Sequence, residues 1–411
     1  MRGQGTLGRT GWTIVDQGIS SFSNVLVVVV TARAVSAGDF GRFSLALTAY
    51  SVVVGLCRAA TGEPLLVVAS SRVARSDDGR VLGGATLAGL AGGLLLAVAA
   101  LLGGGVLAWI LAVSLTGLLV QDAARYVLIA GGRPSLAALA DATWVIGVLA
   151  AFVVAAPDSA SAYLGLWAGA GAVSALIGIG LAGARPRLRG ASAWLGEHRV
   201  LIRRFVAEFA FLSGASQIVV LLVGFRTSAA DAGALRAAGT LLGPAGVFTN
   251  GLLLATVVEA GRHRRAAAMT RVVLAAAVSA GAVMVTMGLV LRFVPPTWGV
   301  VLLGDSWAGA SHVAPPLSLA FAGTAVATVV AAGMRGSGRT RESVRLVTAL
   351  AAGVLLCGSL AAGRGAATTA AAMAVPAWIG AMVTIARWRR GPAPTVDPDS
   401  EYPSTDLEPA S

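Results

Sequence analysis

Two apolar runs between Gly11 and Pro64 carry polar side chains where a membrane-spanning helix would be expected to have none. These side chains belong to Asp16, Asn24, Arg58 and Glu63. An ionisable group at the centre of a bilayer costs roughly 3 kcal/mol or more, so it normally faces the inside of a helix bundle or a water-filled cavity. The four residues are therefore candidates for the lining of a transport pathway.

Asp16, Ser20, Ser23 and Asn24 have a spacing that places them on one face of a helix. A polar stripe on a helix of valine and leucine is typical of a cavity wall. The alternative is that Asp16 lies at the membrane interface and that the serines bond neighbouring backbone between packed helices.

A second group of polar residues follows in the run Gln121-Asp-Ala-Ala-Arg-Tyr126. Asp122 and Arg125 are three residues apart, so they can pair on one helix face and reduce the cost of burying each other. The same pair could instead anchor one end of the helix at the membrane interface.

A third group, Arg236 and Asn250, lies on either side of the sequence Gly243-Pro244. Proline breaks the hydrogen-bond ladder of a helix. Within a membrane such a break is tolerated only against other protein or a water-filled cavity. We expect Arg236, Thr240 and Asn250 to share a face that leads inward, although a simple packing kink would explain the proline equally well.

The composition indicates an all-α polytopic membrane protein. Of the 411 residues, 56% are apolar and only 12% are charged, whereas an ordinary soluble domain has about 25% charged residues. The net charge of +12 comes from arginines alone, because the sequence contains no lysine. Most of these arginines lie in short loops between apolar runs, which favours a membrane topology signal over nucleic-acid binding. A Walker phosphate loop requires a lysine, so this sequence holds none.

Taking a membrane span as about 20 residues, the apolar runs predict about twelve transmembrane helices. They cover residues 12–33, 41–62, 81–102, 106–130, 136–156, 162–184, 205–226, 233–258, 271–294, 311–334, 344–362 and 367–386.

The predicted organisation is two lobes of six helices. Residues 1–11 form a cytoplasmic N-terminal lead, 12–184 the N-lobe, 185–204 a basic cytoplasmic linker, 205–390 the C-lobe and 391–411 a disordered acidic tail. The hexapeptides that begin at Gly38 and at Gly233 are similar, which suggests that the halves are repeats with the same orientation.

The arginines also predict the orientation. Twenty-four of the 31 lie in the N-terminal segment, in alternate loops or after the last helix. By the positive-inside rule, these segments and both termini face the cytoplasm of an inner or plasma membrane.

The sequence indicates no cofactor and no metal site. The three histidines are far apart and none belongs to a cluster with metal-ligand spacing. The two cysteines lie in separate apolar runs and are interpreted as small buried hydrophobic residues. The run Gly3–Gly8 matches a dinucleotide-binding pattern, but no strand precedes it.

Several motifs, taken in order, resemble the polysaccharide-biosynthesis and O-antigen (Wzx-like) flippases of the multidrug/oligosaccharidyl-lipid/polysaccharide (MOP) exporter superfamily. They are Trp12–Asn24, Gly38-Asp-Phe-Gly-Arg-Phe43, Glu63-Pro64, Gln121–Tyr126, Gly233–Pro244 and Leu303-Gly-Asp-Ser-Trp307. The likeness extends over nearly the whole membrane region. Gly239 departs from it, because family members have a glutamine there.

The resemblance implies a V-shaped bundle with a cavity between the lobes that opens alternately to each side. It also implies a transporter, and no enzyme, that flips a polyprenyl-diphosphate-linked oligosaccharide or polysaccharide precursor to the outer leaflet. Candidate partners are this lipid-linked glycan, membrane lipids, and a glycan polymerase or glycosyltransferases of the same pathway. In this interpretation Arg58, Arg125 and Arg236 attract the diphosphate, because guanidinium binds phosphate with two parallel hydrogen bonds.

Two other functions compete with this one. The first is a proton- or sodium-coupled multidrug antiporter of the same superfamily, in which Asp16 carries the ion. A cationic drug requires negative cavity walls, so the arginines within helices favour the anionic cargo. The second is a membrane glycan polymerase, which would be expected to have a sizeable extracytoplasmic loop. The longest such loop, Pro295–Ser311, is short and apolar.

We predict that reporter fusions place both termini and the loop 185–204 in the cytoplasm, because of the arginine distribution. A cysteine introduced at Ser192 should be inaccessible to a membrane-impermeant thiol reagent in intact cells. Labelling of that cysteine from outside would contradict this topology.

Overall fold

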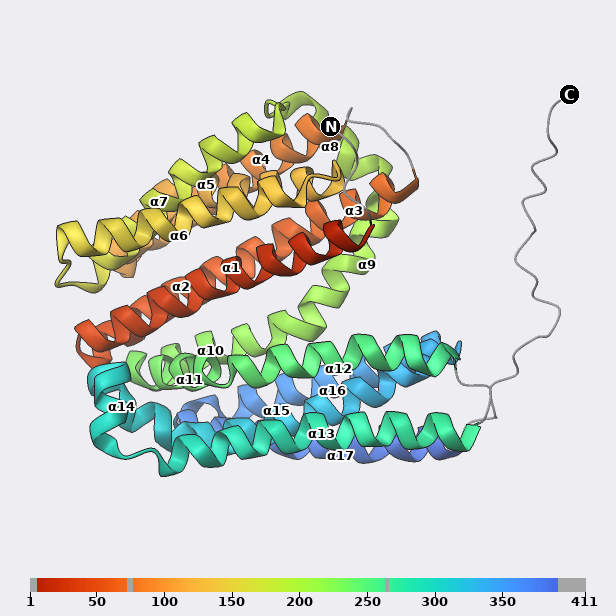
Figure 1. Ribbon diagram of the computed structural model, residues 1–411. Coiled ribbons are helices and arrows are strands. Elements are labelled where there is room, and N and C mark those ends of the chain that lie inside the picture. Colours follow the sequence, from red (N-terminus) through yellow and green to blue (C-terminus); the bar gives the residue numbers. More distant parts are fainter. Residues whose placement is uncertain (1–5, 72–76, 263–265, 391–411) are drawn as a thin grey trace, which may run out of the picture.

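The computed structural model describes residues 6–71, 77–262 and 266–390, and within these ranges every regular element is a helix (Figure 1). The all-helical fold class predicted from composition is thus confirmed. The tail from residue 391, the first five residues of the N-terminal lead, and Arg72 and Arg75 lie outside the described residues.

The described residues of the first half of the chain form seven α-helices and one π-helical turn. The helices are α1 (Thr6–Ala34), α2 (Ala37–Ala60), α3 (Gly62–Ser71), α4 (Asp78–Ala99), α5 (Gly105–Ala130), α6 (Pro134–Ala155) and α7 (Ala160–Ala182), with the turn η2 (Ala100–Gly104) between α4 and α5. Helix α1 begins at Thr6, so residues 6–11 of the predicted lead are helical.

The second half begins with a short helix, α8, which precedes the longer segments. The elements are α8 (Leu188–Glu197), α9 (Arg199–Phe209), η3 (Ala210–Gly214), α10 (Ala215–Arg226), α11 (Ala229–Leu241), α12 (Gly243–Arg262), α13 (Ala266–Phe293), α14 (Pro296–Leu303), η4 (Gly304–Ser306), α15 (Trp307–Gly336), α16 (Thr340–Ala361), η5 (Ala362–Arg364) and α17 (Ala366–Arg390). When α2–α3, α9–α10 and α11–α12 are each counted as one interrupted segment, the described residues contain the twelve long segments that the apolar runs predicted.

The outer surface of the bundle is suited to hydrocarbon. Eight stretches of the described residues are long and apolar enough to cross a membrane, among them Asp78–Ala130, which contains two crossings. Large apolar side chains point outward, such as Val113 (78% exposed) and Val154 (86% exposed). Exposure of apolar surface on this scale would be unfavourable in water. The protein is therefore a multi-pass membrane protein.

The helices form two groups that approach each other at one end and diverge toward the other, as in a V (Figure 1). We use N-lobe for α1–α7 and C-lobe for α10–α17. The terminal end is the end where α1 begins and α17 ends, and the distal end is the opposite one. In Figure 1 the lobes diverge toward the terminal end.

At the distal end, α2 of the N-lobe packs against α11 of the C-lobe through two glycines. A Cβ atom on Gly41 would lie 1.9 Å from the carbonyl oxygen of Ala229, and a Cβ on Gly233 would lie 3.0 Å from the Cα of Gly41. Any larger side chain at Gly41 would force the two helices apart. The backbones of the lobes are thus in direct contact here.

Both of these helices begin with the same cap. Ser36 accepts a hydrogen bond from the backbone N–H of Asp39, and Ser228 accepts one from that of Asp231. Each cap satisfies a helix N–H that would otherwise lack a partner. The equivalent segments are therefore 36–41 and 228–233, each of which ends in a contact glycine. The alignment of Gly38 with Gly233 that we expected from sequence is wrong by three residues.

Two further contacts join the lobes at the distal end. Gly304 of η4, in the left-handed region at φ 55°, lies under the end of α1, where a Cβ would be 2.8 Å from the carbonyl oxygen of Arg33. On α10, Gly224 receives the side chain of Leu45 from α2. Close packing at these points closes the distal end.

The turn between α5 and α6 ties three segments of the N-lobe together. Gly132 adopts a positive φ of 72°, and the N–H of Arg133 donates to the carbonyl oxygen of Leu128. This pattern ends a helix in a Schellman-type turn. The Arg133 guanidinium then donates to the carbonyl oxygens of Leu181 and Ala182, at 2.9 and 3.1 Å, at the end of α7.

The C-lobe repeats this arrangement between α15 and α16. Gly338 has a φ of 82°, the N–H of Arg339 donates to Met334, and its guanidinium donates to the carbonyl oxygen of Arg387 at the end of α17. In each half, an arginine that follows a glycine turn donates to carbonyl oxygens at the end of the last helix of that half. These hydrogen bonds identify the two lobes as parallel repeats.

Helix α8 is attached to the N-lobe at the terminal end. The indole of Trp194 is fully buried and donates to the carbonyl oxygen of Ala60 at 3.2 Å. Glu197 accepts a hydrogen bond from Arg80 of α4 at 2.7 Å, and this bond lowers the pKa of the Glu197 carboxyl. From α8 the chain enters α9, whose Phe209 packs on Gly55 of α2 before the π-turn η3 leads into the C-lobe.

We predict that Gly41→Ala lowers the thermal stability of the purified protein, because the added methyl group collides with the backbone of α11. Overpacking of this kind costs about 1–3 kcal/mol, although alanine itself favours a helix over glycine by up to about 1 kcal/mol. The measurement is the unfolding midpoint in detergent.

The matched control is Gly38→Ala, one turn earlier on α2, where the only atom near a Cβ is 4.0 Å away. This variant should be as stable as the wild type or more stable. Equal midpoints for the two variants would show that the glycine contact does not hold the distal end together.

Candidate functional site

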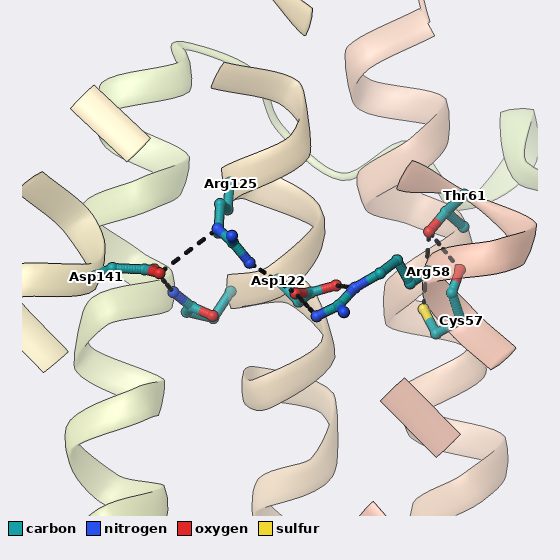
Figure 2. A network of polar contacts seen from close by, with 7 residues as sticks. Cys57, Arg58, Thr61, Asp122, Arg125 and Asp141 are labelled. Atoms are coloured by element: carbon teal, nitrogen blue, oxygen red, sulfur yellow. Dashed lines mark hydrogen bonds and ion pairs between the residues drawn. The ribbon is translucent and has the colours of Figure 1, made fainter. Parts of the chain in front are cut away.

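A network of buried charged side chains lies between α2, α5 and α6 of the N-lobe (Figure 2). Arg58 reaches from α2 to Asp122 on α5 with two hydrogen bonds, NH2 to Oδ1 at 2.6 Å and Nε to Oδ2 at 3.2 Å. Two parallel hydrogen bonds between a guanidinium and a carboxylate are strong and directional. Arg58 therefore forms the closest ion pair of Asp122.

Arg125 lies between two carboxylates in the same network. Its NH1 is 3.8 Å from Asp122, one turn earlier on α5, and its Nε is 3.5 Å from Asp141 on α6. Gln121 donates to the other oxygen of Asp141 at 2.7 Å. The Asp122–Arg125 pair that the sequence predicts is thus present. The distance between its charged groups is long because Arg58 makes the two short hydrogen bonds to the Asp122 carboxylate.

Aromatic side chains and a glycine support this network. The ring of Tyr126 lies near both guanidinium groups, with 5.6 Å to the Cζ of Arg58 and 6.0 Å to that of Arg125. Cations are attracted to the face of an aromatic ring. Tyr126 packs in turn on Gly62, where a Cβ would be only 2.5 Å from the ring. The start of α3 consequently has room for only a glycine beside the network.

Glu63 and Glu208 add negative charge next to the network. Glu63 is half-buried on α3 and interacts electrostatically with Arg58 and with Glu208 on α9. Together with Asp122 and Asp141, these residues bring four carboxylates to a region with two guanidinium groups, Arg58 and Arg125. The charged cluster of the N-lobe therefore contains more acid than base among its described side chains.

A second centre lies in the C-lobe around Arg236. The side chain borders a cavity of about 240 Å³ between α10, α11, α15 and α17. Its NH1 donates weakly to Gln217 at 3.4 Å, and its buried Nε has no hydrogen-bond partner. Within the described part of the chain, no carboxylate pairs with Arg236, unlike the arginines of the N-lobe. A guanidinium in this state is suited to bind an anion.

The helix break predicted at Gly243-Pro244 lies close to this cavity. Helix α11 ends at Leu241 and α12 begins at Gly243, and both Gly239 and Thr240 line the cavity. A Cβ on Gly239 would meet no atom within 4 Å. The glycine that departs from the family pattern thus leaves open space beside Arg236.

The two centres lie at different depths. Arg58 follows the cap residue Ser36 by 22 positions, and Arg236 follows Ser228 by eight. At 1.5 Å per residue the two arginines lie roughly 33 and 12 Å from the distal end. Measured along the helix axes, they are separated by about 20 Å, so one diphosphate cannot bind both at once.

Three candidate residues remain. Asn24 on α1 is exposed and its neighbour Ser23 is buried. The side chain of Ser20 lies outside the described residues, so the polar stripe on this helix stays a prediction. Asn250 on α12 is exposed and is absent from the lining of the Arg236 cavity. The side chain of Asp16 lies outside what the structure describes.

Sequence reasoning did not select Asp141 or Glu208, although both belong to the N-lobe cluster. Asp141 is an acid within the apolar run 136–156, so the rule that selected Arg58 would also have selected it. Glu208 lies near the start of the run 205–226, where the sequence alone suggests a residue at the membrane interface. Its place beside the cluster follows from the packing of α9 against α2 and α3.

No protein-family profile and no curated protein matches the chain. Solved structures do match it. The lipid II flippase MurJ in an inward closed conformation has a TM-score of 0.73 at 12% identity, over 92% of this chain and 88% of MurJ. An inward-facing MATE family transporter of the MOP superfamily scores 0.70 at 12% identity, over 92% and 97%. The chain shares the fold of these two proteins.

The lobe arrangement also distinguishes between conformations of this fold. An outward-facing MATE family transporter of the MOP superfamily covers the same 92% of the chain but scores only 0.56. The better agreement with inward structures is consistent with the distal contacts through Gly41 and Gly304.

We predict unequal effects of removing the two partners of the central ion pair. Asp122→Asn leaves Arg58 and Arg125 with less negative charge and should lower the unfolding free energy by about 3–5 kcal/mol. Arg58→Gln should cost less, because Asp122 keeps Arg125 as a partner. The double variant should be no less stable than Asp122→Asn alone. The measurement is denaturant unfolding in detergent micelles.

The matched control is the Arg42–Asp39 pair, which is also an ion pair but is exposed at the start of α2. Its double-mutant cycle should show only weak coupling, since solvent screens exposed pairs. Equal coupling in both cycles would contradict a specific stabilising role for the buried pair.

Proposed function

We propose that the protein is a membrane transporter that flips a polyprenyl-diphosphate-linked oligosaccharide or polysaccharide precursor between leaflets by alternating access. The glycan and diphosphate would pass between the lobes, while the polyprenyl chain remains in the bilayer. The fold shared with MurJ, a lipid II flippase, supports a lipid-linked cargo.

The observation that carries this proposal is the state of Arg236. Its guanidinium borders a cavity within the C-lobe and lacks a carboxylate partner among the described residues. Keeping a cation in this position is costly unless an anion neutralises it for part of the transport cycle. A diphosphate supplies such an anion and fits the planar guanidinium.

In this proposal Arg58 and Arg125 do not attract the diphosphate, the role that the sequence suggested for them. Their charges are already balanced by Asp122 and Asp141, so they are weaker attractors for phosphate than Arg236. We assign them to holding α2, α5 and α6 together beside the cargo pathway. Positive charge for the cargo then comes chiefly from the C-lobe.

We further propose that the terminal end faces the cytoplasm, as the arginine distribution indicates. In this orientation the lobes diverge toward the side on which the cargo is synthesised, and the distal contacts close the outer side. Cargo would enter from the inner leaflet of the plasma membrane. A glycan polymerase or glycosyltransferases of the same pathway would be the functional partners.

The second candidate function is a proton- or sodium-coupled multidrug antiporter. The N-lobe cluster favours it, since Asp122, Asp141, Glu63 and Glu208 outnumber the two nearby arginines and could bind a cation. The MATE transporters that share the fold also support it. The uncompensated Arg236 argues against a cationic cargo in the C-lobe.

We predict that Arg236→Ala reduces export of a surface or secreted glycan by about tenfold or more, the effect of losing a charged hydrogen bond of about 1.5–3 kcal/mol. Lipid-linked precursor should then accumulate in the cytoplasmic leaflet. Arg236→Lys should restore only part of the export, because lysine keeps the charge but loses the planar fork. Export is measured on cells in which the variant replaces the native protein.

The matched control is Arg345→Ala, an exposed change near the start of α16 that should leave export unchanged. Normal export by Arg236→Ala, together with loss of ion-dependent dye efflux in Asp16→Asn, would reject the flippase and favour the antiporter.

A further inference from the structure

A cavity of about 990 Å³ opens at the distal end and shares no lining residue with the Arg236 cavity or with the N-lobe network. Its walls come from α2, α4, α5 and α7 of the N-lobe and from Leu221 and Phe225 on α10 of the C-lobe. Its volume is at the upper end of the range of small-molecule pockets. The cavity is therefore large enough for part of a lipid.

The polarity of the lining changes with depth. The charged and hydroxyl residues lie in the first turns of α2 and at the start of α7; they are Ser36, Asp39, Arg42, Asp158, Ser159 and Ser161. Beyond them the cavity follows α2 as far as Ala49, roughly 20 Å from Ser36, and follows α5 from Gly105 to Leu111, roughly 9 Å. The lining of this deeper part is apolar. An amphiphile with its head at the distal surface matches this gradient.

The cavity also opens at an apolar part of the outer surface. Leu102 and Phe225 border it and are 84% and 79% exposed. Between α4 and α5 the chain turns through Gly103 and Gly105, which have φ values of 106° and 71° and no atoms where a Cβ would be. The three glycines of this turn, Gly103 to Gly105, add backbone and no side chains to the rim. A lipid chain can therefore enter from the surrounding hydrocarbon.

The charges at the distal end of the cavity indicate the kind of headgroup that would fit there. Arg42 donates to Asp39 with one of its five N–H groups, which leaves donors for a phosphate. Asp158 is exposed and has no cationic partner among the described residues. The distal end of the cavity thus carries one guanidinium and two carboxylates, a net charge of −1. This arrangement suits a headgroup that has both a phosphate and an ammonium group.

We propose that this cavity binds one phospholipid with an amine headgroup, phosphatidylethanolamine, from the leaflet at the distal end. One acyl chain lies along Leu45, Ala46 and Leu111, the phosphate binds Arg42, and the ammonium group binds Asp158. The site is independent of the proposed cargo and of which end faces the cytoplasm.

The proposed site has a consequence for conformation, since both lobes form it. Leu221 and Phe225 belong to α10, and their position against α2 depends on the packing of Gly224 on Leu45. Separation of the lobes at the distal end would remove this wall. A ligand that binds only one conformation shifts the population toward it. The bound phospholipid would therefore stabilise the state that is closed at the distal end.

The test is native mass spectrometry of detergent-purified protein titrated with phosphatidylethanolamine or with phosphatidylglycerol of the same acyl chains. We expect one phosphatidylethanolamine to bind at roughly tenfold lower concentration than phosphatidylglycerol. Ala46→Phe fills the cavity and should abolish this binding, and it should also abolish the rise in unfolding temperature that added phosphatidylethanolamine causes. Ala150→Phe, on the exposed face of α6, should bind as the wild type does.

Asp158→Asn tests the headgroup without altering the interior. It should weaken phosphatidylethanolamine binding roughly tenfold and remove the preference over phosphatidylglycerol. Asp305→Asn is the control, because Asp305 is exposed in η4 but does not line the cavity. Equal binding of the two lipids by wild-type protein, or binding unaffected by Ala46→Phe, would overturn the proposal. Retention of only a polyprenyl lipid would also overturn it and would assign the cavity to the cargo.

Discussion

The cost of placing charge in hydrocarbon governs the interior of this protein. In the N-lobe this cost is offset locally, because Arg58 and Arg125 lie against Asp122 and Asp141 at 2.6 to 3.8 Å. Each residue alone would be unfavourable in the membrane, but the alternation of cation and anion across α2, α5 and α6 makes the set tolerable. The network thereby links three helices of the N-lobe to one another.

The C-lobe follows the same backbone plan with a different distribution of charge. The turns at Gly132-Arg133 and Gly338-Arg339 form equivalent hydrogen bonds in the two halves. The charged interiors are not equivalent, since among the described residues Arg236 has Gln217 as a weak partner and no carboxylate. The repeated architecture thus carries an unequal distribution of charge in the two lobes.

Close backbone packing joins the two lobes at the distal end. Gly41 and Gly233 bring α2 and α11 so near that there is no room for a larger side chain between them. The cavity beside this contact is bounded by residues of both lobes. Motion of the lobes would therefore change the packing and the cavity together.

Hydropathy and the spacing of arginines were sufficient to predict the helical membrane class and the twelve segments, since each span must satisfy its own backbone hydrogen bonds locally. The same reasoning found Arg58, Asp122, Arg125 and Arg236, because an ionisable residue in an apolar run is conspicuous. It could not tell which arginine is neutralised. That depends on Arg58 reaching a carboxylate 64 residues away while Arg236 reaches none in the part of the chain that the structure describes. Pairing between distant helices is decided by their packing, so only the tertiary structure separates a structural ion pair from an available cation.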